Sequence, residues 1–204
     1  RLDGRMCRSW LWAAQLEVNE EIKSNETAFL VPLEGATKEG QAKFMSEDYL
    51  NKNKVATKRV TIPTRQHDTG RGWGDYEWIP TMKLIRVDRL PVTRVWTRGK
   101  ETGTSPSNQS FCIESKESVE FCAGATAIAS ITDEDAAKYQ YYFAGKPLPT
   151  VMDEDVRGFA ANVLSREFGN RTLDKGRSEK AQIFATTFTE TQDFFKERGV
   201  TLLA

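Results

Sequence analysis

A long apolar strand is predicted at Val119-Glu-Phe-Cys-Ala-Gly-Ala-Thr-Ala-Ile-Ala-Ser-Ile131. Its residues are mostly small, which lets another element approach the strand closely. Three helix-like segments follow it, and the chain then reaches a short strand, Gly199-Val-Thr-Leu-Leu203, directly after a helix stop. Strands first, helices afterwards and a closing strand are typical of an α+β fold, in which an antiparallel or mixed twisted sheet carries three packed helices.

Helix starts are predicted from two approximate capping boxes, Thr132-Asp-Glu-Asp135 and Thr150-Val-Met-Asp153. The first opens a helix over residues 136–143. The second opens a helix that ends at residues 169–170. Its apolar positions recur at helical spacing and form one stripe: Val156, Phe159, Ala160, Val163, Leu164 and Phe168.

A third helix is predicted from Ser178, after a basic turn over residues 171–177. Gly199 is its left-handed stop. Its apolar face is formed by Ile183, Phe184, Phe188, Phe194 and Phe195.

The first half of the chain predicts strands joined by polar connections. Alternating or apolar runs mark strands at residues 9–18, 25–35, 55–63, 81–97 and 110–114. Leu90-Pro91 breaks the strand at residues 81–97. The strand at residues 110–114 forms a hairpin with the strand from Val119 through a turn at residues 115–118. Residues 36–54 indicate a surface excursion with a helical turn from Ser46, and residues 64–78 an exposed loop.

Composition excludes several classes of protein. The 204 residues predict one domain or two small ones, and 29 basic residues balance 29 acidic ones, so no global field attracts nucleic acid. No run approaches the ~20 apolar residues of a membrane-spanning helix.

The three cysteines, Cys7, Cys112 and Cys122, lack metal-binding spacing and are interpreted as free thiols in a reducing compartment, with a Cys112–Cys122 bridge between neighbouring strands as the alternative.

Aromatic and arginine residues supply the candidate contact sites. Trp10 and Trp12 lie on one face of the first strand, either as a membrane-interface belt or packed on a helix. Residues 64–78 interleave glycine, arginine and aromatics, which is compatible with docking on a neighbouring subunit or with binding single-stranded nucleic acid. The candidates in this segment are Trp73, Tyr76 and Trp78, with Arg65 and Arg71 as basic contacts.

Catalytic signatures are not found in the sequence. His67 is the single histidine, and a Cys112 or Cys122 nucleophile paired with it lacks a third supporting residue. The acidic clusters at residues 133–135 and 153–155 are interpreted as helix caps. Arginines in the helical half are interpreted as partners in i,i+3 and i,i+4 salt bridges on a solvated face, with lipid headgroups or nucleic acid as the alternative partners: Arg157, Arg166, Arg171 and Arg177. We therefore expect no enzyme activity, no cofactor and no metal.

Over residues 9–204 the sequence resembles the SPFH (band 7) domain shared by stomatins, prohibitins and flotillins. The resemblance rests on the order of several short segments: Asn25-Glu-Thr-Ala-Phe-Leu-Val, Ile85-Arg-Val-Asp88, Thr93 to Trp96, Glu114-Ser115, Val156-Arg157, Leu164-Ser-Arg166, residues 173–177 and Gly199-Val200. It divides the chain into a flexible segment 1–8, a sheet-rich subdomain 9–131 and a helical subdomain 132–204. An insertion at residues 38–78 departs from the compact stomatin-like pattern.

The resemblance implies a non-catalytic scaffold. Members of this family form large homo- or hetero-oligomeric rings or cages, attach to membrane lipid through a segment outside this domain, continue into a coiled coil and bind clients such as membrane proteases. We therefore expect a soluble domain of a longer, membrane-associated protein on the cytoplasmic side. The alternatives are a soluble assembly protein without an anchor and a nucleic-acid-binding module that uses the loop of Arg71 and Trp73.

Overall fold

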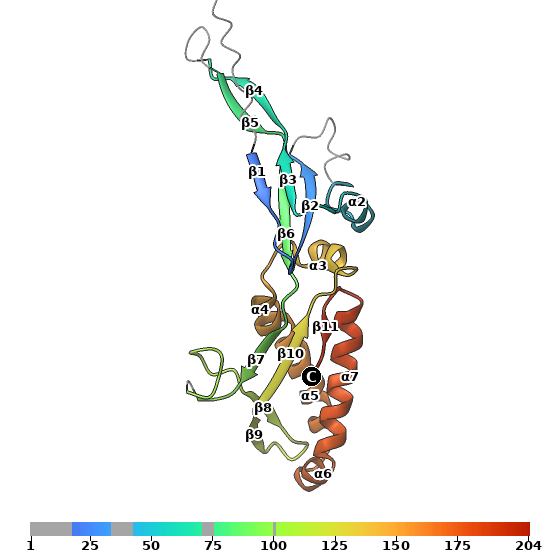
Figure 1. Ribbon diagram of the computed structural model, residues 1–204. Helices are drawn as coiled ribbons and strands as arrows, with labels where there is room; N and C mark the ends of the chain where they lie inside the picture. Colours follow the sequence, from blue (N-terminus) through green and yellow to red (C-terminus); the bar gives the residue numbers. More distant parts are fainter. Residues whose placement is uncertain (1–17, 34–42, 71–75, 100) are drawn as a thin grey trace, which may run out of the picture.

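The computed structural model describes residues 18–33, 43–70, 76–99 and 101–204. Within these residues the chain is α+β, which confirms the predicted class, and its strands pair only in antiparallel fashion. They are distributed over one three-stranded sheet and four two-stranded sheets. Figure 1 shows an elongated molecule, with a hairpin at one end and helices around the three-stranded sheet at the other.

Two of the small sheets lie in the middle of the molecule. They are formed by β1 (Val18–Glu21) with β3 (Arg59–Ile62), and by β2 (Glu26–Pro32) with β6 (Met82–Asp88). Helix α2 (Glu47–Lys52) starts at Ser46, whose hydroxyl oxygen accepts a hydrogen bond from the Tyr49 N–H, so the predicted helical turn is confirmed. Leu50 of α2 is fully buried in the same core as Phe29, so this segment also contributes to the core.

The segment predicted as an exposed loop over residues 64–78 is largely a hairpin. Strands β4 (Thr64–Asp68) and β5 (Tyr76–Pro80) pair along their whole length and project at one end of the molecule (Figure 1). A hydrogen bond of 2.9 Å from Thr81 N–H to the Pro63 carbonyl closes its base. The loop prediction was wrong because this ribbon is exposed or half-buried throughout, so it lacks the alternation of a half-buried strand.

The chain changes partner at Leu90-Pro91, where the predicted break is found. Strand β7 (Val92–Trp96) leaves the middle of the molecule and pairs with β10 (Ala125–Ser130), which also pairs with β11 (Thr201–Leu202). The three-stranded sheet therefore has the order β11-β10-β7, and its outer strand comes from the end of the helical stretch.

The long strand predicted over residues 119–131 is two strands in two sheets. Strand β9 (Glu120–Ala123) forms a hairpin with β8 (Phe111–Glu114), as predicted, and β10 follows after Gly124. A Cβ at Gly124 would lie 3.2 Å from both Thr97 Cγ2 and the Trp96 carbonyl oxygen. The chain passes so close to the end of β7 here that the strand bends and enters another sheet.

Helices occupy most of residues 136–196. They are α3 (Ala136–Phe143), α4 (Leu148–Val151), the π-helical turn η1 (Met152–Val156), α5 (Arg157–Gly169), α6 (Leu173–Ser178) and α7 (Lys180–Lys196). The three predicted helices are present. The second starts earlier than predicted, at α4, and α6 occupies the predicted basic turn. None of the helices in the described residues has the length and apolar character needed to cross a membrane.

The predicted apolar stripes form the core of the helical half. Along the end of η1 and α5, all stripe positions are buried except Phe159, which stacks on Phe194 of α7 at a ring distance of 4.3 Å. Ile183 and Phe195 of α7 are buried, and the other members of its predicted face pack against the core. Gly199 has φ +85°, which confirms the left-handed stop after α7.

Candidate functional site

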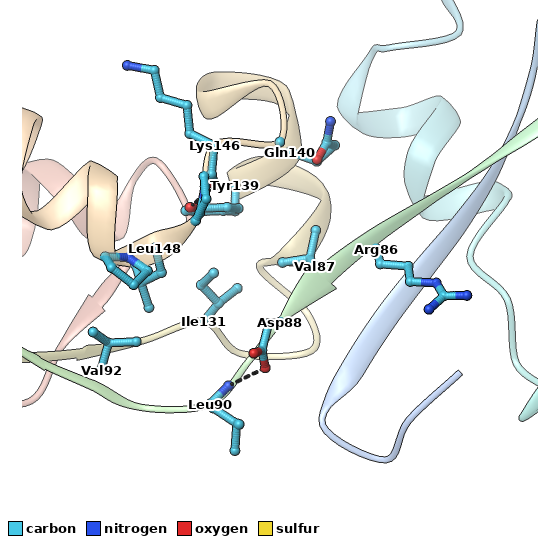
Figure 2. A pocket seen from close by; sticks show the side chains of 13 residues that line it. Arg86, Val87, Asp88, Leu90, Val92, Ile131, Tyr139, Gln140, Lys146 and Leu148 are labelled. Carbon is cyan, nitrogen blue, oxygen red and sulfur yellow. Dashed lines mark hydrogen bonds between the residues drawn. The ribbon is translucent and has the colours of Figure 1, made fainter. Parts of the chain in front are cut away.

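A cleft of about 390 Å³ lies where the end of β6 meets the turn between α3 and α4. Figure 2 shows side chains from both parts of the chain converging on it. Apolar residues form much of the wall: Val87, Leu90, Val92, Ile131 and Leu148. The polar groups at the cleft are Arg86, Asp88, Tyr139, Gln140 and Lys146.

Most polar groups of the cleft already have partners. Asp88 Oδ1 accepts hydrogen bonds from the Leu90 N–H at 3.0 Å, drawn in Figure 2, and from Asn25 Nδ2 at 2.8 Å. The Tyr139 hydroxyl donates to the Lys146 carbonyl at 2.6 Å, and burial, followed by the charge of Asp155, raises the pKa of this phenol.

The two basic groups at the cleft are also held in ion pairs. Lys146 Nζ lies 3.1 Å from Glu154 Oε2, and this hydrogen bond raises the pKa of the lysine. Arg86 Nη2 lies 2.5 Å from Glu20 Oε2. These two charges therefore serve to hold neighbouring segments together.

Gln140 differs from the other polar residues of the cleft. Its side chain is 3% exposed, and its Oε1 has no hydrogen-bond partner within the described residues. A buried acceptor without a partner is unfavourable unless a donor reaches it. Because Gln140 Oε1 is itself buried, the cleft offers a ligand mainly its apolar walls.

A second polar cluster ties β7 to the π-helical turn. Asp153 Oδ2 lies 2.5 Å from Arg94 Nη2, and its Oδ1 accepts the indole N–H of Trp96 at 2.9 Å. The prediction that Asp153 caps a helix is wrong, because the helical stretch begins upstream and Asp153 points to the sheet instead. π-Helical turns are frequent at functional sites, but here the turn serves to aim this carboxylate.

A third cluster links the middle of the molecule to the start of α3. The Asp133 carboxylate accepts the Thr27 hydroxyl at 2.6 Å and forms an ion pair with Lys54. The hydrogen bond from Lys54, followed by that from Thr27, lowers the pKa of Asp133. Asp133 is therefore a tertiary link, whereas Thr132 Oγ1 accepts the Asp135 N–H at 3.1 Å, as in the predicted cap.

The predicted contact residues are only partly described. Tyr76 and Trp78 lie on β5, where Tyr76 faces Asp68 and Trp78 faces Gln66 across the ribbon. Side chains two residues apart share a face, so the two aromatics lie together. Arg65 faces Ile79 and projects from the opposite face. Trp10, Trp12, Trp73 and Arg71 lie outside the described residues.

The interpretation of all cysteines as free thiols is wrong for Cys112 and Cys122, which form a disulfide across β8 and β9. His67 belongs to β4, opposite Glu77, and no contact joins it to these cysteines. The alternative prediction, a Cys112–Cys122 bridge between neighbouring strands, is confirmed.

Among the described residues, three of the four predicted arginines of the helical half have partners. Arg171 pairs with Glu167, four residues earlier, at 2.7 Å, as predicted. Arg166 instead pairs with Glu190 of α7 at 2.6 Å, which is a contact between two helices. Arg157 Nε donates to the Asp153 carbonyl at 3.2 Å.

Comparison with known proteins gives no assignment, since no family model and no curated protein matches the sequence.

Proposed function

We propose that this chain is a non-catalytic assembly domain of a membrane-associated scaffold of the SPFH type, whose copies build a ring or cage that organises membrane and client proteins. The observation that carries the proposal is the projecting hairpin of β4 and β5. The α+β class and the order of strands, helices and closing strand support it.

The β4–β5 hairpin is suited to contact with another chain. Within the described residues β4 and β5 form a two-stranded sheet of their own. A two-stranded ribbon is only marginally stable by itself. A partner that packs on the ribbon therefore stabilises the ribbon as well as the complex.

The side chains of the hairpin favour another protein as the partner. Tyr76 is 54% exposed and shares a face with the half-buried Trp78. Tyrosine and tryptophan are enriched in the energetically dominant parts of protein interfaces. On the described strands Arg65 and His67 are accompanied by Asp68 and Glu77, so this ribbon carries no excess of positive charge that would favour nucleic acid.

A second copy of the chain is the partner we propose. The formal net charge of the chain is zero, so copies do not repel each other over long range. A projecting hairpin that docks on a different surface of the next copy makes a head-to-side contact, and repeated contacts of this kind close into rings. Membrane attachment through a segment outside this chain, on the cytoplasmic side, rests on the family resemblance.

Light scattering coupled to size-exclusion chromatography tests the proposal. The unmodified chain is run over a concentration series next to Tyr76→Arg and Tyr141→Arg. Tyr141, on α3, is the matched control because it is 53% exposed. We expect a multi-subunit mass for the unmodified chain and for Tyr141→Arg, and a smaller mass for Tyr76→Arg.

A monomer at every concentration, or equal dissociation by both substitutions, contradicts assembly through the hairpin. Circular dichroism of Tyr76→Arg establishes that it is folded. Co-sedimentation of the full-length parent protein with anionic liposomes then separates the membrane-associated scaffold from a soluble assembly protein without an anchor.

A further inference from the structure

Four potential metal ligands share the outward face of the β8–β9 hairpin. The register sets Cys112 opposite Cys122 and Glu114 opposite Glu120. Because side chains alternate along a strand, these four residues lie on one face. The other face carries Phe111 and Ile113, each 3% exposed, so the core fixes which face points outward.

Three potential ligand atoms lie close together. The Sγ atoms of Cys112 and Cys122, bonded to each other in the disulfide, and a carboxylate oxygen of Glu120 all lie within 4.8 Å of one another. Two sulfur ligands of a tetrahedral zinc ion are about 3.8 Å apart, given zinc–sulfur bonds of about 2.3 Å. After reduction the two sulfurs must therefore separate to this distance by rotation of their exposed side chains.

The two glutamates supply an independent indication of a cation. Glu114 and Glu120 face each other directly across the ladder, and like charges at such positions are unfavourable. Neither carboxylate forms an ion pair with any of the residues that the structure describes. A divalent ion bound between the cysteines and the glutamates removes this repulsion.

Local charge also favours a cation once the cysteines are reduced. Both cysteines and Glu120 line an open depression of about 590 Å³ together with Arg98. The two carboxylates, Glu120 in the depression and Glu114 beside it on the same face, outweigh the single guanidinium, so a divalent ion meets an excess of negative charge before the thiols lose their protons. Thiolate ligands select zinc and similar soft ions over magnesium or calcium.

We propose that the outward face of the β8–β9 hairpin is a redox-gated site for a thiolate-binding divalent cation such as zinc, with Cys112, Cys122 and Glu120 as ligands and Glu114 as the fourth. In the disulfide form the two sulfurs are bonded to each other and the site is closed. The inference does not depend on the assembly proposed above, because β8–β9 and β4–β5 are separate hairpins.

Opening the site is a thiol–disulfide exchange with a dithiol reductant. The reductant gives two electrons and two protons to the Cys112–Cys122 bond, which breaks into two thiols, and the reductant itself becomes a cyclic disulfide. The metal ion then displaces the two thiol protons and binds two thiolates. In a reducing compartment the open form prevails, whereas an oxidising compartment keeps the disulfide.

Cobalt(II) is the probe for the test, because tetrahedral cobalt–thiolate sites absorb visibly and in the near ultraviolet. The full chain is titrated with Co²⁺ after reduction with a dithiol and removal of the excess, and again in the oxidised form. We expect one equivalent to bind with sulfur-to-cobalt charge-transfer absorption in the reduced form only, and Zn²⁺ to displace it.

Substitutions identify the ligands. Cys112→Ser removes the charge-transfer band, and Glu120→Gln and Glu114→Gln each weaken binding by about tenfold or more. Cys7→Ser and Glu101→Gln, an exposed glutamate outside the hairpin, serve as matched controls and leave binding unchanged. All five variants are checked for folding by circular dichroism.

Three results overturn the proposal. They are equal Co²⁺ binding by the oxidised and reduced chains, loss of binding in Cys7→Ser, and unchanged affinity in both Glu114→Gln and Glu120→Gln. Failure of the reduced chain to bind any Co²⁺ overturns it as well.

Discussion

Trp96 and Asp153 are joined by a hydrogen bond of 2.9 Å between the indole N–H and a carboxylate oxygen, which ties β7 to the π-helical turn before α5. Arg94 pairs with the second oxygen of the same carboxylate. Both side-chain partners come from one strand. The carboxylate therefore fixes the orientation of the sheet relative to the helical layer at a half-buried position.

Asp153→Ala is expected to lower the free energy of unfolding by about 2–4 kcal/mol, because it leaves the Trp96 indole and the Arg94 guanidinium without their acceptor. Urea unfolding followed by tryptophan fluorescence measures the change. Asp155→Ala is the control, since Asp155 lies in the same turn and its carboxylate is 4.0 Å from Lys146. A loss below 0.5 kcal/mol for Asp153→Ala, or equal losses for the two variants, contradicts the role of this link.

Gly199→Ala is expected to destabilise the chain by at least about 2 kcal/mol. The residue has φ +85°, and an added Cβ would lie 2.6 Å from the Asp135 carbonyl oxygen and from Tyr139 N. Gly158→Ala makes the same chemical change inside α5, where nothing lies within 4 Å, and should stabilise by about 0.5–1 kcal/mol. Thermal unfolding of the two variants should therefore shift in opposite directions, and shifts of the same sign would refute the argument.

Asp133 gives the link between Thr27 and Lys54 a defined pH dependence. The folded pKa lies below the ordinary value of 3.8, so the contribution of this carboxylate to stability is complete above that value and is lost as the pH falls through the folded pKa. Because the side chain is 49% exposed, solvent screening limits the contribution to about 1 kcal/mol or less.

Asp133→Asn should therefore be less stable than the unmodified chain at pH 6, and the difference should shrink as the pH falls below 3.8. Urea unfolding at several pH values measures it. Glu134→Gln, which changes the neighbouring exposed carboxylate, is the matched control. A difference for Asp133→Asn that does not vary with pH is the contrary outcome.

Gln140→Met tests whether the acceptor in the cleft is truly without a partner. Removing a buried carbonyl that has no donor should leave the chain as stable as before or stabilise it by up to about 1 kcal/mol. Tyr139→Phe is the comparison, because it removes a hydroxyl that donates to the Lys146 carbonyl, and it should cost about 1 kcal/mol. A clear loss of stability in Gln140→Met would mean that a donor, such as bound water, holds the oxygen.

Sequence patterns predicted the elements whose conformation is set by residues close together in the sequence. The stripe from Val156 to Phe168 identified α5 because helical spacing alone sets which side chains share a face. The stop at Gly199 followed from the conformational freedom of that residue. The hairpin of β8 and β9 was recognisable from two short strands around a polar turn.

Features that depend on long-range packing could not be predicted. The change of sheet at Gly124 is imposed by the chain at Trp96 and Thr97, which no window around residue 124 contains. The ribbon of β4 and β5 gave no alternation because neither face is deeply buried. Asp153 matched a capping pattern, but its carboxylate is used by a strand about 60 residues earlier in the sequence.

The place of β11 in the sheet has a kinetic consequence. Leu202 pairs with Ala129, and all of the helices from α3 to α7 lie between them in the sequence. During synthesis β10 must therefore wait, with one backbone edge open, until the last of these helices has left the ribosome. Such non-local pairing slows folding and leaves an edge available to other nascent chains. Completion of this sheet is thus a late step, and until it occurs a growing chain presents an open strand edge for misassembly.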